Sequence, residues 1–162
     1  SEEGWCHLLE WQCRRQRRVV RSTFSAELNA LIDAVETAIL VQLLLHEMQH
    51  GADRTAAELA ATQEEGRLEP ELLAATDARA VYEALAAKEV CEPAESSLKL
   101  HLLSLRDKVL RGVVRRVYWL DTRDMLPDGL TKGSVDRAAL REAAENGVWK
   151  PAHDTQAHPP AA

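Results

Sequence analysis

The segment between Ser22 and Gly51 constrains the fold more than any other part of the chain. Ser22 or Thr23 can serve as a helix N-cap, and Gly51 is a typical helix stop. Between Ala38 and Leu45 only Gln42 is polar, which predicts a helix buried on most sides in its second half. This apolar run is too short to span a bilayer, so we expect no membrane partner. The apolar residues recur at helical spacing: Leu28, Leu31, Ile32, Val35, Ile39, Leu43 and Met48.

The segments around this helix predict an α/β fold with a mixed sheet flanked by helices. An acidic insertion rich in Ala and Glu, over about 52–71, is expected to be a helix or only partly ordered. A turn-rich segment over 121–133 precedes the last helix. We expect one domain over 1–150 and a disordered tail over 151–162, which is rich in Pro, His and Ala. The predicted strands lie at 5–20 (two strands around a turn), 72–75 and 113–120, and the further helices at about 78–90, 96–111 and 135–145.

Composition and charge exclude several classes of protein. The 162 residues include only three cysteines, too few for a disulfide framework, and the chain opens with an acidic Ser1-Glu2-Glu3 rather than a signal peptide. We therefore expect an intracellular protein, cytoplasmic or nuclear and not secreted. The net charge of −6 argues against a wholly basic surface, but residues 58–95 alone carry −7 and the rest of the chain balances at +1. Five arginines form a cluster that either contacts phosphates or protects an exposed strand edge: Arg14, Arg15, Arg17, Arg18 and Arg21.

One motif suggests a metallopeptidase. His46-Glu47-Met48-Gln49-His50 matches H-E-x-x-H, in which two histidines on one helix face bind zinc and the glutamate acts as general base. The continuation that would supply a third histidine is missing, because Asp53 and Ala56 stand where Gly and His are required. A structural role for both histidines in the last turn of a helix explains the same residues.

Three carboxylates offer a different chemistry. Glu27 lies in the first turn of the long helix, Asp77 directly follows a predicted strand, and Asp128 precedes the last helix. Carboxylates gathered from such positions can bind Mg²⁺, and a pair of these ions promotes phosphodiester hydrolysis. Each residue also has a purely structural interpretation: Glu27 as a helix-dipole partner, Asp77 as an N-cap and Asp128 as a turn residue.

Four blocks that occur in order over about 8–133 resemble the ribonuclease H domain of copia-type LTR retrotransposon polyproteins. Arg21–Glu27 resembles the R-S-[ST]-x-x-A-E signature of that family, and Thr76–Ala80 resembles its D-N-x-x-A block, with Ala78 in place of the usual Asn. Leu98–Asp107 is similar to a helix that ends in an Arg-Glu pair. The last block combines a closing strand with an A-D-x-L-T-K motif, matched here by Val117–Thr122 and Pro127–Lys132.

The resemblance implies a ribonuclease H fold and an endonuclease that cleaves the RNA strand of RNA–DNA hybrids with Mg²⁺, or with Mn²⁺. Glu27, Asp77 and Asp128 would be the second, third and fourth members of the family's D-E-D-D tetrad, catalytic and metal-binding. The five arginines would contact the hybrid, and the rest of the polyprotein, including its reverse transcriptase, would be a partner. The first aspartate belongs to an upstream strand, which we expect this chain to lack, so we expect impaired cleavage. The alternatives are an inactive remnant that binds nucleic acid or a protein, and a zinc peptidase using His46, Glu47 and His50.

Overall fold

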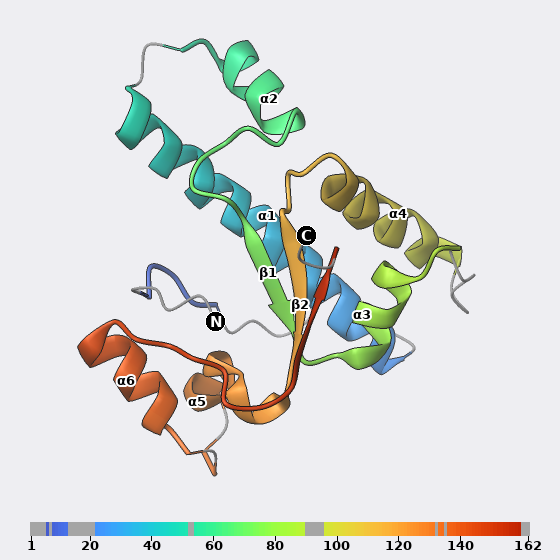
Figure 1. The fold of residues 1–162 in the computed structure, drawn as a ribbon. Coiled ribbons are helices and arrows are strands. Elements are labelled where there is room, and N and C mark those ends of the chain that lie inside the picture. Colours follow the sequence, from blue (N-terminus) through green and yellow to red (C-terminus); the bar gives the residue numbers. More distant parts are fainter. Residues whose placement is uncertain are drawn as a thin grey trace. The chain divides into compact units, whose positions relative to one another are not determined.

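The computed structural model describes residues 6, 8–12, 22–51, 54–89, 96–131, 133–134 and 136–159. These residues divide into two compact units, each described by itself (Figure 1). The larger unit takes its described residues from Val20–Trp119 and Ala157–Ala162, and the smaller unit from Ser1–Val19 and Leu120–Gln156.

The structure is mixed α/β, as predicted, and its strands form a three-stranded mixed sheet in the order β1-β2-β3. β1 and β2 are parallel, with Leu73 opposite Arg116 and Thr76 opposite Trp119. The first two strands confirm the predictions for 72–75 and 113–120, although the second is shorter than expected. The strands span Leu73–Thr76 (β1), Arg116–Leu120 (β2) and Thr155–His158 (β3).

The long helix α1 covers Thr23–His50, and both of its predicted ends are confirmed. The Oγ atom of Ser22 accepts a hydrogen bond from the backbone N–H of Ser25 at 3.1 Å, as an N-cap residue does. At the other end the chain leaves the helix through Gly51, whose φ of 85° is a conformation that glycine adopts without steric cost.

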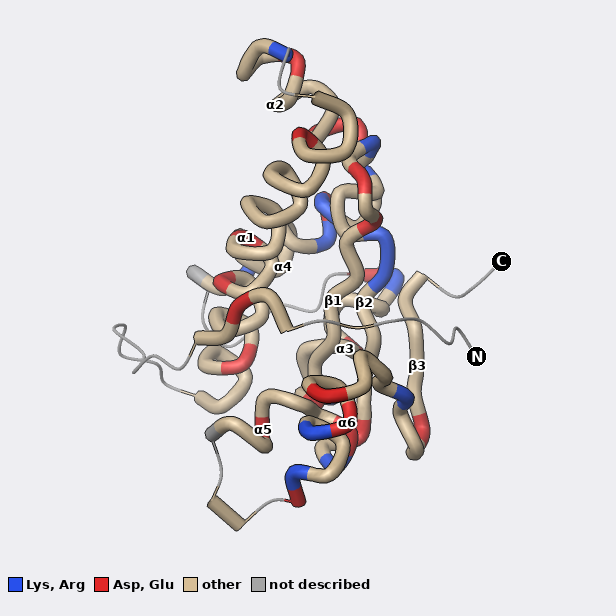
Figure 2. The backbone as a smooth tube through the Cα atoms, turned by 90° about the vertical axis from the view of Figure 1, so that its left-hand side faces the viewer, with Lys and Arg blue, Asp and Glu red and all other residues tan. Residues whose placement is uncertain are grey.

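The core of the larger unit lies between the sheet and a helix layer formed by α1, α3 (Arg79–Ala86) and α4 (Ser96–Leu110). Figure 2 shows α1 and α4 on the same side of β1 and β2. Each apolar side chain of this size contributes about 1.5–3 kcal/mol when it is fully buried. The buried cluster consists of Leu28, Leu31, Val35, Ile39, Val81, Tyr82, Leu85, Leu98, Leu102, Leu105, Val109, Val113, Val114 and Val117.

The second half of α1 does not match its predicted burial. Leu40, Leu44 and Met48 are 67%, 58% and 74% exposed, so the prediction of a helix buried on most sides is wrong here. The reason is geometric, because the helix layer and the sheet cover only one side of α1. Length and apolar composition alone would allow α1 to span a membrane, but the core helix of a folded domain passes the same test, and α1 packs against α3, α4 and β1.

The acidic insertion forms a helix, α2, over Ala56–Glu64. Thr55 and Glu58 make a reciprocal capping box at its start, which explains why this Ala- and Glu-rich segment is helical. After α2 the chain turns at Gly66, whose φ is 63°, and this turn lies directly against the backbone of Arg111 and Gly112.

The smaller unit contains more helix than the sequence predicts. The segment over 121–133, expected to be turns, forms a short 3-10 helix, η1 (Thr122–Asp124), and a six-residue helix, α5 (Leu126–Thr131). The last helix, α6, predicted over 135–145, spans Ala138–Asn146, and Gly147 at its end is in the left-handed conformation.

Two predictions at the chain ends are wrong in the described residues. The tail expected to be disordered forms β3 over Thr155–His158, because it finds a partner in β2. Residues 8–12, expected in a strand, have no regular secondary structure, and Leu8, Leu9 and Trp11 are exposed. The second extended piece predicted before Ser22 lies outside the described residues.

Candidate functional site

Glu27 is the fifth residue of α1 and is exposed. The prediction placed it in the first turn, but α1 begins at Thr23, so Glu27 lies just beyond that turn. An acid at this depth gains less from the helix dipole than one in the first turn, which weakens the structural interpretation of Glu27. The capping residue is Ser22, whose Oγ lies 2.8 Å from the Oγ of the buried Ser25.

Asp77 directly follows β1 and is half-buried, as the sequence predicts for a carboxylate at a strand end. Its structural interpretation as an N-cap is wrong, because the N-cap residue of α3 is Ala78, which makes no side-chain capping bond. The backbone at Asp77 is fixed on both sides. Trp119 Nε1 donates to the carbonyl of Asp77 at 3.1 Å, and the N–H of Ala78 donates to the Oγ1 of the buried Thr76 at 3.1 Å.

Glu27 and Asp77 come to the same end of the larger unit. Figures 1 and 2 show the N-terminal end of α1 at the end toward which β1 and β2 run. The carboxyl ends of parallel strands are where α/β folds commonly bind ligands. A positively charged residue also lies at this end, since the Arg79 guanidinium carbon is 5.4 Å from the centre of the Trp119 ring.

Asp128 belongs to the smaller unit, in the first turn of α5 and half-buried. Its backbone N–H donates to the carbonyl of Met125 at 3.2 Å. The structure therefore brings Glu27 and Asp77 to one end of one unit and places Asp128 in the other. Within the described residues no group of three or more His, Cys, Asp or Glu side chains forms a metal site. The five arginines predicted to contact nucleic acid, 14, 15, 17, 18 and 21, lie outside the described residues.

The histidines of the H-E-x-x-H motif hold the end of α1 to the segment after α2. His46 is 4% exposed, its Nδ1 accepts the backbone N–H of Glu69 at 3.0 Å, and its Nε2 lies 3.0 Å from Arg54 Nη1. Both partners are donors, and a neutral imidazole has one accepting nitrogen, so only one of these contacts is a full hydrogen bond. Burial, with the charges of His50 and Arg54, lowers the pKa of His46 and keeps the ring neutral.

His50 also takes part in the contact between the end of α1 and the segment after α2. Its Nε2 lies 3.2 Å from Glu69 Oε2, and its ring centre lies 4.5 Å from that of His46. Each ring nitrogen of His46 therefore faces a donor rather than an open position where a metal ion and water could bind. These contacts give the motif a structural role, and nothing in the described residues favours a zinc peptidase.

Two carboxylates of the smaller unit were missed by the sequence analysis. Asp124 is 7% exposed and accepts hydrogen bonds from the N–H groups of Ala152 and His153 and from His153 Nδ1, at 2.8–3.1 Å. Burial raises its pKa, but these bonds outweigh burial and the net pKa is lowered. Asp121 binds the guanidinium of Arg123 through both oxygens, at 2.8 and 2.9 Å, which lowers its pKa strongly. No local signal marks Asp124, because its partners lie 28 and 29 positions away.

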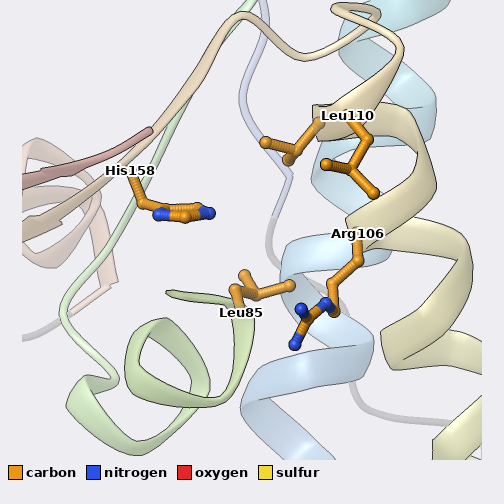
Figure 3. Close-up of a pocket in the computed structure, with 5 residues that line it drawn as sticks. Leu85, Arg106, Leu110 and His158 are labelled. Atoms are coloured by element: carbon orange, nitrogen blue, oxygen red, sulfur yellow. The ribbon is translucent and has the colours of Figure 1, made fainter. Parts of the chain in front are cut away.

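A small hollow in the larger unit is too small for a substrate. It has a volume of about 30 Å³, far below the roughly 300–1,000 Å³ of ligand pockets, and is lined by Leu85, Arg106, Val109, Leu110 and His158 (Figure 3). The Arg106 guanidinium donates to the carbonyls of Ala84 and Lys88, at 3.4 and 3.3 Å. Burial and the charge of Arg106 lower the pKa of His158. Arg106 therefore joins α4 to the end of α3, a structural role for one residue of the family-like blocks.

Comparison of the chain with protein-family models, with curated proteins and with solved structures finds no match in any of the three. The family resemblance therefore rests on the sequence blocks alone.

Proposed function

We propose that this chain is a ribonuclease H-type nuclease domain that cleaves the RNA strand of RNA–DNA hybrids by metal-assisted hydrolysis. The observation that carries the proposal is the position of Glu27 and Asp77, one near the start of α1 and one at the carboxyl end of β1, at the same end of the larger unit. Glu27 lies beyond the first turn of α1, and the N-cap position of α3 belongs to Ala78 rather than to Asp77. Two carboxylates at such an end supply oxygen ligands of the kind that Mg²⁺ prefers.

Asp128 is included in the proposed site because of its position in the sequence blocks. It stands where the resembling family has the last metal-binding aspartate, and the arginines at 14, 15, 17, 18 and 21 would contact hybrid phosphates. Mg²⁺ or Mn²⁺ bound by these carboxylates would activate the attacking water and stabilise the leaving oxygen. The proposal includes the reverse-transcriptase part of a copia-type polyprotein as partner and an intracellular location.

Cleavage of a 5′-labelled RNA strand in an RNA–DNA hybrid tests the proposal. The assay uses the chain alone and the chain extended by its upstream coding sequence, which the resemblance expects to supply the remaining aspartate. We expect Mg²⁺-dependent cleavage by the extended chain and a loss of at least about 100-fold in Asp77→Asn and Asp128→Asn, as for removal of a ligand from a two-metal site. Asp33→Asn, a change of an exposed acid on the outer part of α1, is the matched control and retains activity.

Two results decide against the nuclease. Equal cleavage by the extended chain and its Asp77→Asn variant would remove the assigned residue from the reaction. Hybrid binding that persists in EDTA, with no turnover in Mg²⁺ or Mn²⁺ for either form of the chain, would instead identify a binding module that has kept the fold without the chemistry.

A further inference from the structure

The segment that carries α2 is attached to the end of α1 by polar contacts. We define the α2 arm as residues 54–70, and Figure 1 shows α2 near the C-terminal end of α1. Gln42, His46 and His50 are spaced by four residues, so they lie along one side of α1. All three contact Leu68–Pro70 at the end of the arm.

Apolar burial contributes little to this attachment. Among residues 54–70, all of which the structure describes, only Thr62 and Leu68 are buried. Segments with few buried apolar contacts open at a lower free energy than the core of the same domain. The polar contacts, among them the 3.0 Å hydrogen bond from the N–H of Glu69 to His46 Nδ1, therefore decide whether the arm is held.

The arm has a defined limit on each side. It follows Gly51, whose φ is 85° and where a Cβ atom would meet no atom of the described chain within 4 Å, so the chain is loosely packed at this point. After the arm, the carbonyl of Leu72 accepts the N–H of Arg115 at 2.8 Å, and Arg115 Nε lies 3.4 Å from Glu71 Oε1. These two contacts fix the chain where it enters β1, so the arm can move without disturbing the sheet.

The contact at His46 requires a neutral ring. A protonated imidazole carries a donor on both nitrogens and accepts no hydrogen bond. A proton on His46 would therefore place an N–H against the N–H of Glu69 and a positive charge 3.0 Å from Arg54 Nη1.

The groups around His46 oppose this proton while the arm is closed. Burial is the largest cause of the lowered pKa of His46, and the charges of His50 and Arg54 act in the same direction. Glu69 acts in the opposite direction, but its side chain is 65% exposed and its carboxylate lies 3.2 Å from His50 Nε2. Among the described groups, these three supply the charges that act on His46.

We propose that the α2 arm is an acid-sensitive switch: a proton on His46 breaks the hydrogen bond to Glu69 and releases the arm from α1, while the core stays folded. The bonds that Gln42 donates to the end of the arm, the shorter at 2.7 Å, do not titrate. The packing of Gly66 against the turn after α4 does not titrate either. These contacts hold the arm equally at every pH near neutrality, and His46 adds the pH dependence.

The direction of the switch follows from proton uptake. In the open arm water reaches His46, and its pKa returns to the ordinary value of about 6.5. The open arm then binds a proton more tightly than the closed arm, so it gains in population as the pH falls below about 6.5.

Hydrogen–deuterium exchange of the full chain, followed by mass spectrometry at pH 7.5, 6.5 and 5.5, tests the switch. A nine-residue helix is not stable alone in water, so the amides of α2 lose protection whenever the arm is released. After correction for the intrinsic pH dependence of exchange, we expect their exchange to become several-fold faster between pH 7.5 and pH 5.5. The limit is about tenfold for one group with an open-state pKa of about 6.5. The amides of α4 are the internal reference, and their corrected exchange stays constant.

Two variants distinguish His46 from other titrating groups. His46→Asn keeps an accepting oxygen near the position of Nδ1 and does not titrate, so we expect the pH dependence of α2 exchange to disappear. His101→Gln removes a histidine of α4 and is the matched control that retains the pH dependence. Circular dichroism checks that each variant is folded, and His46→Gln replaces His46→Asn if that variant is not.

Three outcomes overturn the proposal. Equal protection of α2 at pH 7.5 and pH 5.5 would show that acid does not release the arm. A loss of protection in α4 together with α2 would show that His46 supports the whole domain rather than the arm. A His46→Asn chain whose α2 still opens with falling pH would assign the response to another group, such as the pair of His50 and Glu69.

Discussion

Replacement of Gly66 by alanine tests the packing between the turn after α2 and the turn after α4. A Cβ atom at Gly66 would lie 2.5 Å from the carbonyl oxygen of Arg111 and 2.6 Å from the carbonyl carbon of Gly112. These are backbone atoms, so one of the two turns must move. Gly112 provides a matched control, because its φ of 78° is similar to the 63° of Gly66 and a Cβ there meets no atom within 4 Å.

Both variants place alanine in a left-handed conformation, but only Gly66→Ala also introduces a steric clash. A left-handed conformation costs alanine about 1–2 kcal/mol, and the stiffer unfolded chain returns about 0.4–1 kcal/mol, so Gly112→Ala should destabilise by about 1 kcal/mol. The clash at Gly66 adds about 1–3 kcal/mol, as overpacking does in a dense interior, for a total of about 2–4 kcal/mol. Urea titrations followed by circular dichroism measure both values. Equal destabilisation by the two variants would show that the turns are not in contact, and would refute this part of the structure.

Three further predictions follow from burial and charge. Leu102→Ala, at a position 1% exposed, should lower the free energy of unfolding by about 2–5 kcal/mol, whereas Leu110→Ala, 83% exposed, should change it by less than about 0.5 kcal/mol in thermal or urea unfolding. The pKa of His46 is lowered in the folded chain, so its contribution to stability is complete above its unfolded-state pKa of about 6.5 and is lost as the pH falls below 6.5. The midpoints of urea unfolding should therefore decrease between pH 7.5 and pH 5, and His46→Gln should reduce this decrease. The pKa of Asp124 is also lowered, so the stability that it contributes is present above about pH 4 and is lost as the pH falls through its folded-state pKa. Acid unfolding of Asp124→Asn should lack this pH-dependent loss of stability. An acid-unfolding curve of Asp124→Asn identical to that of the wild type would contradict the hydrogen bonds to His153.

The features that the sequence predicts correctly are those encoded within a few residues. The ends of α1 follow from Ser22 and Gly51, whose effects on the backbone are local. Asp77 was placed after a strand because the apolar run before it is short and ends at Thr76, and the structure confirms that position. The sequence predicts Glu27 in the first turn, whereas it lies just beyond that turn, since a helix boundary is uncertain by a residue or two even when its cap is clear.

The features that the sequence misses depend on partners far along the chain. β3 has no alternation of apolar and polar residues, and it is a strand because β2 offers it an edge. Asp124 was overlooked for the same reason, because only the fold brings His153 to its carboxylate. The H-E-x-x-H motif shows that a local pattern can also mislead. Its two histidines share a helix face as predicted, but the ring nitrogens of His46 contact Arg54 and the backbone N–H of Glu69.

The wrong prediction for the second half of α1 has a different origin. Apolar composition predicts that a helix face will be buried, but it does not state which molecule buries it. Val35 and Ile39 are covered by this chain, whereas Leu40 and Leu44, on the opposite side of the same helix, are not. The prediction that α1 is buried on most sides thus holds for the side that faces the core and fails for the opposite side.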